Sequence, residues 1–278
     1  MSYKIVVDSC CDLPEELRKN EHFLIVPLSI EVDGYKIVDD DTFNQKELLE
    51  RMKASPNSPK TSCPSPEDYM KAFEDADDVY GVTLSGNLSG SYNSAVLGKK
   101  LYIEEKGQKN IEIFDSCSAA SGEVLIAMKI FELAEAGKNF EEIVKEVTKF
   151  RDEMQTVFVL ESLENLRKNG RLSNIKAAIA TVLNIKPVMS ATDDGQIQKV
   201  NQARGMKKAL AKMVDIIAEG NKDFSNKDLA ISHCNCYDRA VEVMEDIKSK
   251  CNFRNIFIVD TAGISTVYAY DGGIVVAF

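Results

Sequence analysis

Apolar and polar positions along the chain follow two patterns, short continuous apolar runs and longer stretches with one apolar face. Residues 4–8, 78–85 and 110–116 each contain a short apolar run, as expected for strands buried in a parallel sheet. Residues 122–136 and 139–154 place apolar side chains three or four positions apart, which indicates helices. This alternation predicts an α/β fold with a parallel-type sheet in the first part of the chain.

Local signals define the ends of several helices. Ser65 with Asp68, and Asn139 with Glu142, have the spacing of capping boxes, in which two side chains bind each other's backbone N–H groups. Asp12 is the expected N-cap of a short helix.

Two stretches in this part of the chain are each expected to form a single element. We expect residues 23–34 to form one strand, because the run is mostly apolar, and the Pro/Ser-rich residues 55–68 to form a loop that leads into the next helix.

The pattern starts again with an apolar run at residues 156–162, so we place a domain boundary between residues 153 and 154. The second part contains Asp194-Gly195, a pair typical of tight hairpin turns. Its other expected elements are helices over 173–183, 205–219 and 237–250, and strands over 229–234, 255–262 and 271–278. We therefore predict two α/β domains, residues 1–153 and residues 154–278.

The chain has a formal net charge of −10, from 34 Lys and Arg residues against 44 Asp and Glu residues. This sign argues against binding to nucleic acid or to an anionic membrane surface, because both need a positive field. The apolar run near the start of the sequence is too short for a signal peptide. No stretch of the sequence approaches the roughly 20 apolar residues of a membrane span. We expect a cytoplasmic protein whose seven cysteines are free thiols.

A hydroxyl-rich stretch, SGNLSGSYNSA at residues 85–95, lies between a predicted strand and a predicted helix. Ligands of open α/β sheets bind at this edge, and the N–H groups of a helix N-terminus favour an anion. Gly90 allows close approach of the backbone, and Ser89 and Ser91 offer hydroxyl donors. A strand–helix turn capped by Ser89 would explain the same residues, and spacing alone leaves both interpretations open.

Two further groups of residues offer donors for an anion. Thr61 and Ser62, in the stretch KTSCPS, also precede a helix and are not needed for its cap, so they could converge with residues 85–95 on one carboxylate or phosphate. Arg171 lies in a turn and Arg204 at a strand–helix junction, and each could reach an anion across a domain cleft. Ordinary loop hydroxyls and surface charge remain the structural alternatives.

Signals for catalysis or metal binding are weak. A serine nucleophile needs a general base, but His22 is expected on the surface and His233 ends a strand in the other predicted domain. The chain has no G-x-S-x-G elbow and no glycine-rich ATP or dinucleotide motif. HCNC at residues 233–236 has no second ligand cluster, which favours buried thiols over a metal. We expect no cofactor and no metal, with a hydrolase or transferase acting on a small anion at Ser89 and Arg171 as the alternative.

Seven segments, in this order, resemble the DegV family of bacterial fatty-acid-binding proteins: VVDSCCDLP, KTSCPS, LSGNLSGSYNSA, DSCSAASGE, LENLRKNGRLS, LNIKPV and QARGMKKAL. The resemblance spans the whole chain and implies two α/β domains, a buried acyl chain, and a carboxylate held near the domain interface. It implies carboxylate contacts from Thr61 and Ser89. Its further candidates are Ser62, Gly90 and Ser91 beside them, and Arg171 and Arg204 near the head group or a partner surface.

The resemblance also implies a role. Family members with known roles present the bound fatty acid to a separate ATP-dependent kinase, which makes an acyl phosphate for phospholipid synthesis. Many members carry a C-terminal histidine near the carboxyl group, where this chain has Val267 or Tyr268. The protein would then either bind the lipid without serving that kinase or use Tyr268 or Tyr270 in place of the histidine. A regulatory protein that binds the lipid as a signal is a third hypothesis.

Overall fold

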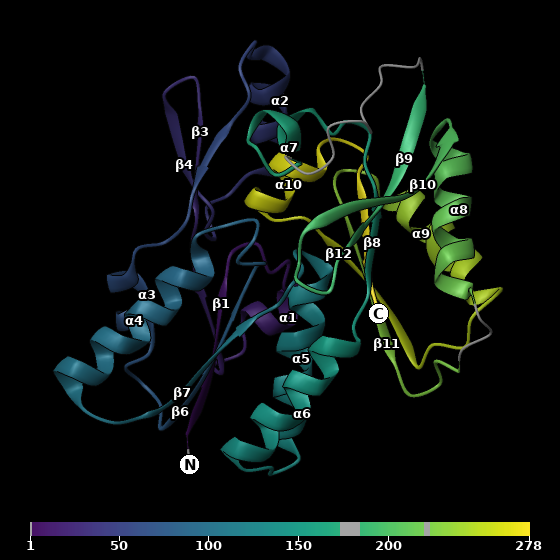
Figure 1. The fold of residues 1–278 in the computed structure, drawn as a ribbon. Coiled ribbons are helices and arrows are strands. Elements are labelled where there is room, and N and C mark those ends of the chain that lie inside the picture. The colour runs from purple at the N-terminus through teal and green to yellow at the C-terminus, as the bar shows by residue number, and fades with distance from the viewer. Residues whose placement is uncertain (1, 173–183, 220–222) are drawn as a thin grey trace.

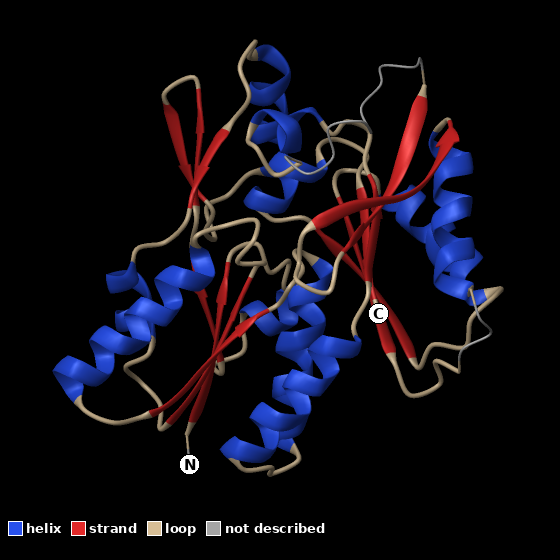
Figure 2. Cartoon of the chain, in the orientation of Figure 1, coloured by secondary structure: helices blue, strands red, loops and turns tan. Residues whose placement is uncertain are grey.

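The computed structural model describes residues 2–172, 184–219 and 223–278 and arranges them as sheets with helices packed around them (Figures 1 and 2). The first sheet has the strand order β2-β1-β6-β7, and all its neighbouring strands are parallel. Its strands are β1 (Tyr3–Asp8), β2 (Phe23–Val26), β6 (Asp78–Thr83) and β7 (Asn110–Asp115). The predicted parallel sheet is therefore confirmed.

Helices cover both faces of this sheet (Figure 1). α3 (Pro66–Ala72) and α4 (Ser91–Lys106) pack against one face, where Val6 and Val79 meet Tyr69. α5 (Ser121–Glu135) and α6 (Phe140–Glu153) pack against the other face, where Ile5 and Val7 belong to the same apolar cluster as residues of both helices. Successive side chains of β1 thus enter opposite cores, which is why Ile5, Val6 and Val7 form a continuous apolar run.

The predicted helix caps are confirmed at two positions and wrong at a third. Ser65 with Asp68 and Asn139 with Glu142 both form capping boxes. Asp12 does not cap α1 (Glu15–Arg18), since Pro14 occupies the N-cap position. The Asp12 carboxylate instead accepts a 2.8 Å hydrogen bond from the backbone N–H of Ala262, at the other end of the chain.

A small antiparallel sheet corrects two expectations. Residues 23–34 form two strands rather than one, because Pro27, which has no N–H group for a ladder, separates β2 from β3 (Ser29–Val32). β3 pairs with β4 (Tyr35–Val38) and with β5 (Lys60–Ser62), a strand within the expected loop 55–68. α2 (Gln45–Ala54) connects β4 to β5 in the chain. Thr61 is thereby held in the ladder opposite Ile30.

The remaining described strands form a mixed sheet with the order β10-β9-β8-β13-β11-β12. They are β8 (Thr156–Val159), β9 (Ile185–Ala191), β10 (Ile197–Arg204), β11 (Asp228–His233), β12 (Asn255–Asp260) and β13 (Ile274–Ala277). The predicted hairpin is confirmed as antiparallel β9–β10, and the strand expected over 271–278 is β13, near the centre of the sheet. The helix expected over 173–183 lies outside the described residues.

The helices of this second part are α7 (Glu164–Lys168), α8 (Met206–Ala218), α9 (Tyr237–Lys248) and α10 (Gly263–Ala269). α8 and α9 pack on one face of the mixed sheet, and α5 contacts the sheet through Leu125, which meets Ala230 and Ala277. α5 therefore lies between the parallel and the mixed sheets (Figure 1). The domain boundary at 153/154 stays a prediction. No described helix has the length and apolarity to cross a membrane.

Candidate functional site

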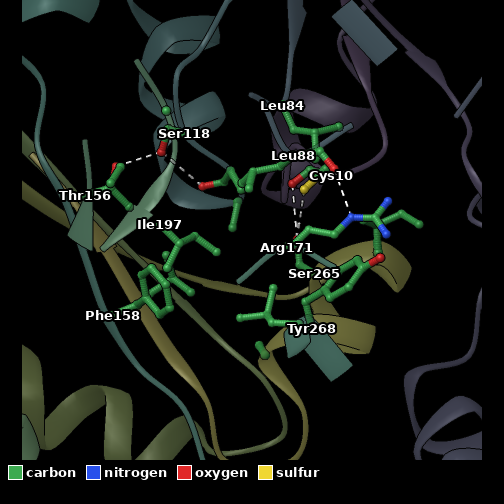
Figure 3. A pocket seen from close by; sticks show the side chains of 18 of the residues that line it. Cys10, Leu84, Leu88, Ser118, Thr156, Phe158, Arg171, Ile197, Ser265 and Tyr268 are labelled. Carbon is green, nitrogen blue, oxygen red and sulfur yellow. Dashed lines mark hydrogen bonds between the residues drawn. The ribbon is translucent and has the colours of Figure 1, made fainter. Parts of the chain in front are cut away.

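A cavity lies between the loops that follow the strands of the first parallel sheet, the mixed sheet and α10, and Figure 3 shows it from close by. The space open to the centre of a water molecule is about 100 Å³. Most of the lining is apolar and comes from both parts of the chain: Leu84, Leu88, Ala119, Ala120, Phe158, Leu160, Leu166, Ala191, Ile197, Ile264, Ala269 and Val275. Such a lining suits an aliphatic ligand, which gains free energy from every apolar group removed from water.

Polar side chains stand at two opposite sides of this lining. Ser118 and Thr156 lie on one side in Figure 3, and their hydroxyl oxygens share a 2.7 Å hydrogen bond. Arg171 and Tyr268 lie on the other side, with the guanidinium carbon 5.8 Å from the centre of the tyrosine ring. The cavity is thus an apolar space with a neutral hydroxyl pair at one end and a cation at the other.

Residues 85–91, which we call the serine loop, connect β6 to α4 beside the cavity. Asp115 binds the start of the loop through the Gly86 N–H group at 3.1 Å. The half-buried Ser89 accepts a 3.2 Å hydrogen bond from the Ser91 N–H group. No hydrogen bond donated by the Ser89 hydroxyl is found among the described residues, so its proton is available to a ligand.

Ser91 has a different role from Ser89. It is fully buried, and its hydroxyl donates a 2.6 Å hydrogen bond to the carboxylate of Asp8. Because that carboxylate only accepts, the 2.6 Å contact between Ser91 and Tyr69 must be a hydrogen bond donated by the tyrosine. The single proton of the Ser91 hydroxyl is therefore directed at Asp8.

The two hydroxyl-rich segments of the sequence lie against each other. A Cβ atom placed on the exposed Gly90 would be 3.0 Å from the sulfur of Cys63, which follows directly after β5. Ser62 is exposed, whereas Thr61 is half-buried and shares a 2.8 Å hydrogen bond with the Tyr268 hydroxyl. Glycine at position 90 permits this close approach, which brings Thr61 toward the serine loop.

Arg171 connects the serine loop to the second part of the chain. Gly170, with a φ of +79°, follows α7 and directs the chain into Arg171. The Arg171 Nε–H donates a 3.1 Å hydrogen bond to the Leu88 carbonyl, next to Ser89, and Nη1 binds the Asn169 carbonyl. A guanidinium has five N–H donors, so these two hydrogen bonds leave donors for an anion.

Arg204 is not brought to this place. It ends β10 with an exposed side chain and is not among the residues that line the cavity. Thr61 and Ser89 do not line the cavity either, but Thr61 binds Tyr268 and Ser89 follows Leu88, and both of these partners line it. Of the two residues that match the family's histidine, Tyr268 lines the cavity, and Val267 is buried in the apolar cluster beneath the small sheet.

Two buried carboxylates hold α10, the helix that carries Tyr268. The Asp39 carboxylate accepts hydrogen bonds from the N–H groups of Gly263 and Ile264, at 2.6 and 2.9 Å, and Asp12 accepts from Ala262. Burial raises the pKa of Asp39 to about 6 and that of Asp12 to about 7. The N-terminal N–H groups of α10 are satisfied by these side chains. No role for Asp39 was predicted from the sequence. The signal available for it was an acidic residue directly after the hairpin of the small sheet.

The geometry does not favour a catalytic serine or a metal. Neither His22 nor His233 lines the cavity: His22 stacks on Tyr3 with ring centres 4.0 Å apart, and His233 Nε2 lies 3.3 Å from Asp260. His22 is half-buried rather than on the surface, which corrects the expectation for it. Within the described parts of the chain, no group of three or more His, Cys, Asp or Glu side chains is placed to hold a metal ion.

Comparison with known proteins places the chain in a family. A structure of a DegV family protein from Ruminococcus gnavus, refined with vaccenic acid, is 51% identical, covers 100% of both chains and superposes with a TM-score of 0.97. The Streptococcus pneumoniae fatty acid kinase (Fak) B3 protein, loaded with linoleic acid, is 33% identical, with a TM-score of 0.91 over 100% of this chain and 99% of that one.

Sequence comparison agrees. A DegV domain-containing protein from Streptococcus gordonii is 37% identical over 281 residues, which cover 100% of this chain and 99% of the relative. The family model described as "Uncharacterised protein, DegV family" matches residues 2–278. The chain therefore belongs to the DegV family.

Proposed function

We propose that the protein binds one long-chain fatty acid without reacting with it, and that the cavity described above holds the acyl chain. The observation that carries this proposal is the apolar lining, which ends at one side in Arg171 and Tyr268. Each CH₂ group taken out of water contributes about 0.8 kcal/mol. An acyl chain of ordinary length thus supplies most of the binding free energy, and the polar end fixes its orientation.

The carboxylate is held, in this proposal, by the hydroxyls of Thr61 and Ser89 and by the guanidinium of Arg171. Ser89 has a free hydroxyl proton, the Thr61–Tyr268 pair has one proton beyond its shared hydrogen bond, and Arg171 supplies the charge. Hydrogen bonds to an ionised group are the strong ones, so this end discriminates a carboxylate from a neutral head group. Ser62 and Gly90 flank these contacts, Ser91 supports the loop, and Arg204 is assigned to a partner surface.

The neighbouring structures support the choice of ligand. The Ruminococcus gnavus protein was refined with vaccenic acid and the Streptococcus pneumoniae protein was loaded with linoleic acid. Both ligands are long-chain carboxylic acids. Presentation of the bound acid to a separate fatty-acid kinase is a finer proposal, and the Fak B3 relative supports it. In such a partnership Tyr268, which lines the cavity, would stand where many members have histidine.

Mass spectrometry of an organic extract of the purified, denatured protein tests the proposal. We expect a fatty acid of about 16 to 18 carbons in near-equimolar amount, because the buried chain would dissociate slowly in water. Absence of any fatty acid from the extract, together with no binding of added palmitate or oleate, would contradict it. Kinase partnership is tested separately, by mixing the loaded protein with ATP and a fatty-acid kinase and measuring acyl phosphate.

A further inference from the structure

Asp8, the last residue of β1, binds the serine loop on both sides of Ser89. Its side chain is completely buried, and Oδ2 accepts hydrogen bonds from the Leu84 N–H group at 3.0 Å and from the Ser91 hydroxyl at 2.6 Å. Oδ1 accepts a third, from the Cys10 N–H group at 3.0 Å. Leu84 precedes the loop and Ser91 ends it, so one carboxylate joins the two ends of the segment that contains Ser89.

A short chain of hydrogen bonds leads from Asp8 to the Ser89 hydroxyl. The Asp8 carboxylate fixes the side chain of Ser91, and the Ser91 N–H group donates a 3.2 Å hydrogen bond to the Ser89 oxygen. Ser89 therefore has its oxygen held and its proton free. Asp8 does not line the cavity, so it acts on a ligand only through the residues that it binds.

The surroundings of Asp8 explain why the residue is a carboxylate. Three donors converge on its two oxygens, and Tyr69 donates to Ser91 behind them. The completely buried Glu123 of α5 interacts with Asp8. Burial and the Asp8 charge raise the pKa of Glu123 well above its usual range, and burial also raises the pKa of Asp8. An amide in place of Asp8 would turn an NH₂ group toward a backbone N–H group, with no acceptor between them.

We propose that Asp8 is a positioning residue of the carboxylate-binding site, which holds the serine loop closed so that the Ser89 hydroxyl is presented to the ligand. This assignment rests on the proposed function, because it concerns the same site. A purely structural role would weaken the binding of every ligand in the cavity. A positioning role weakens only the recognition of the carboxylate.

Equilibrium binding of palmitate and of 1-hexadecanol separates the two roles, because the ligands share a chain and differ in the head group. For wild type we expect tighter binding of palmitate. Asp8→Asn should lower palmitate affinity about tenfold and leave hexadecanol affinity within about twofold, as should Ser89→Ala. The double variant should lose no more than the stronger single variant, because both act through one hydroxyl.

Asp78→Asn is the matched control. Asp78 is also buried and accepts a 2.8 Å hydrogen bond from Asn110, but it lies at the opposite end of β6 and does not contact the serine loop. Its palmitate affinity should equal that of wild type. If Asp8→Asn does not fold, Tyr69→Phe removes only the hydroxyl that donates to Ser91, and it should lower palmitate affinity two- to threefold without changing hexadecanol affinity.

The outcomes distinguish this proposal from the proposed function. Wild type that binds neither ligand contradicts fatty-acid binding itself. If Ser89→Ala weakens palmitate binding while Asp8→Asn, or Tyr69→Phe in its place, leaves it unchanged, the positioning role of Asp8 is overturned and the proposed function stands. Equal weakening of palmitate and hexadecanol binding by Asp8→Asn also overturns it, in favour of a general structural role.

Discussion

Thr61 and Tyr268 share a 2.8 Å hydrogen bond between their hydroxyl groups, although 207 residues separate them in the chain. Thr61 belongs to β5 of the small sheet, and Tyr268 belongs to α10 beside the mixed sheet. The hydrogen bond therefore joins the two parts of the chain beside the cavity, which Tyr268 lines and Thr61 does not.

Tyr268→Phe should weaken fatty-acid binding about fivefold. The substitution keeps the ring beside Arg171 and removes the hydroxyl that orders Thr61, and a typical hydrogen bond contributes about 1 kcal/mol. Calorimetric titration with palmitate measures the change. Tyr237→Phe, on a tyrosine that is 59% exposed, should not alter the affinity. Equal affinities for wild type and Tyr268→Phe would remove the hydroxyl pair from the site.

Arg171→Lys should weaken palmitate binding about tenfold while keeping the charge. A lysine cannot reproduce the guanidinium fork that binds the Leu88 carbonyl and keeps further donors for the ligand. Arg254→Lys is the control, since Arg254 pairs with Asp228 and does not line the cavity. Parallel titrations of the two variants test this, and a lysine variant as tight as wild type would show that charge alone is sufficient.

Substitutions of Ser118 and Thr156, the hydroxyl pair at the other end of the cavity, should have coupled effects on the free energy of unfolding. Both side chains are buried, so Thr156→Val alone leaves the Ser118 hydroxyl without its partner and should cost about 1–3 kcal/mol. Ser118→Ala combined with Thr156→Val should cost less than the sum of the two single variants. Urea unfolding of the four proteins gives the coupling. Strict additivity would mean that the hydroxyls do not depend on each other.

Stability should depend on pH through Asp39. Burial raises its pKa to about 6 in the folded protein, so folding binds its proton more tightly than the unfolded chain does. The stability that this group contributes is fully present below its unfolded pKa and is lost as pH rises through about 6. The stability of wild type relative to Asp39→Asn should therefore be greater at pH 5 than at pH 7.5. A difference between the two proteins that does not change with pH would contradict the raised pKa.

Local features of the sequence were sufficient where one segment decides the structure. The capping boxes at Ser65 and Asn139 depend on side chains three residues apart, and both were predicted. The hairpin at Asp33-Gly34 was not predicted, although an Asp-Gly pair is an equally local turn signal. Both residues have positive φ, as the two central residues of such a turn require. The residues on both sides of Pro27 are apolar, so the sequence pattern does not show that the strands before and after it belong to different sheets.

Other features depend on which distant segments meet. Asp12 was expected to cap its own helix, but the fold brings Ala262 to it, and no spacing in the sequence relates the two residues. The same holds for Thr61 with Tyr268 and for the contact between Gly90 and Cys63. Asp8 is an acidic residue that directly follows the apolar residues 5–7, which is a local signal, but no pattern in the sequence relates it to its partners Leu84 and Ser91.

A crystal structure of the protein with bound palmitate tests the central claim most directly. We expect the carboxylate oxygens within about 3.2 Å of the Ser89 and Thr61 hydroxyl oxygens, and the acyl chain running between Leu84 and Phe158 toward the Ser118–Thr156 pair. A carboxylate at the Ser118–Thr156 end, or palmitate bound outside the cavity, would contradict the account.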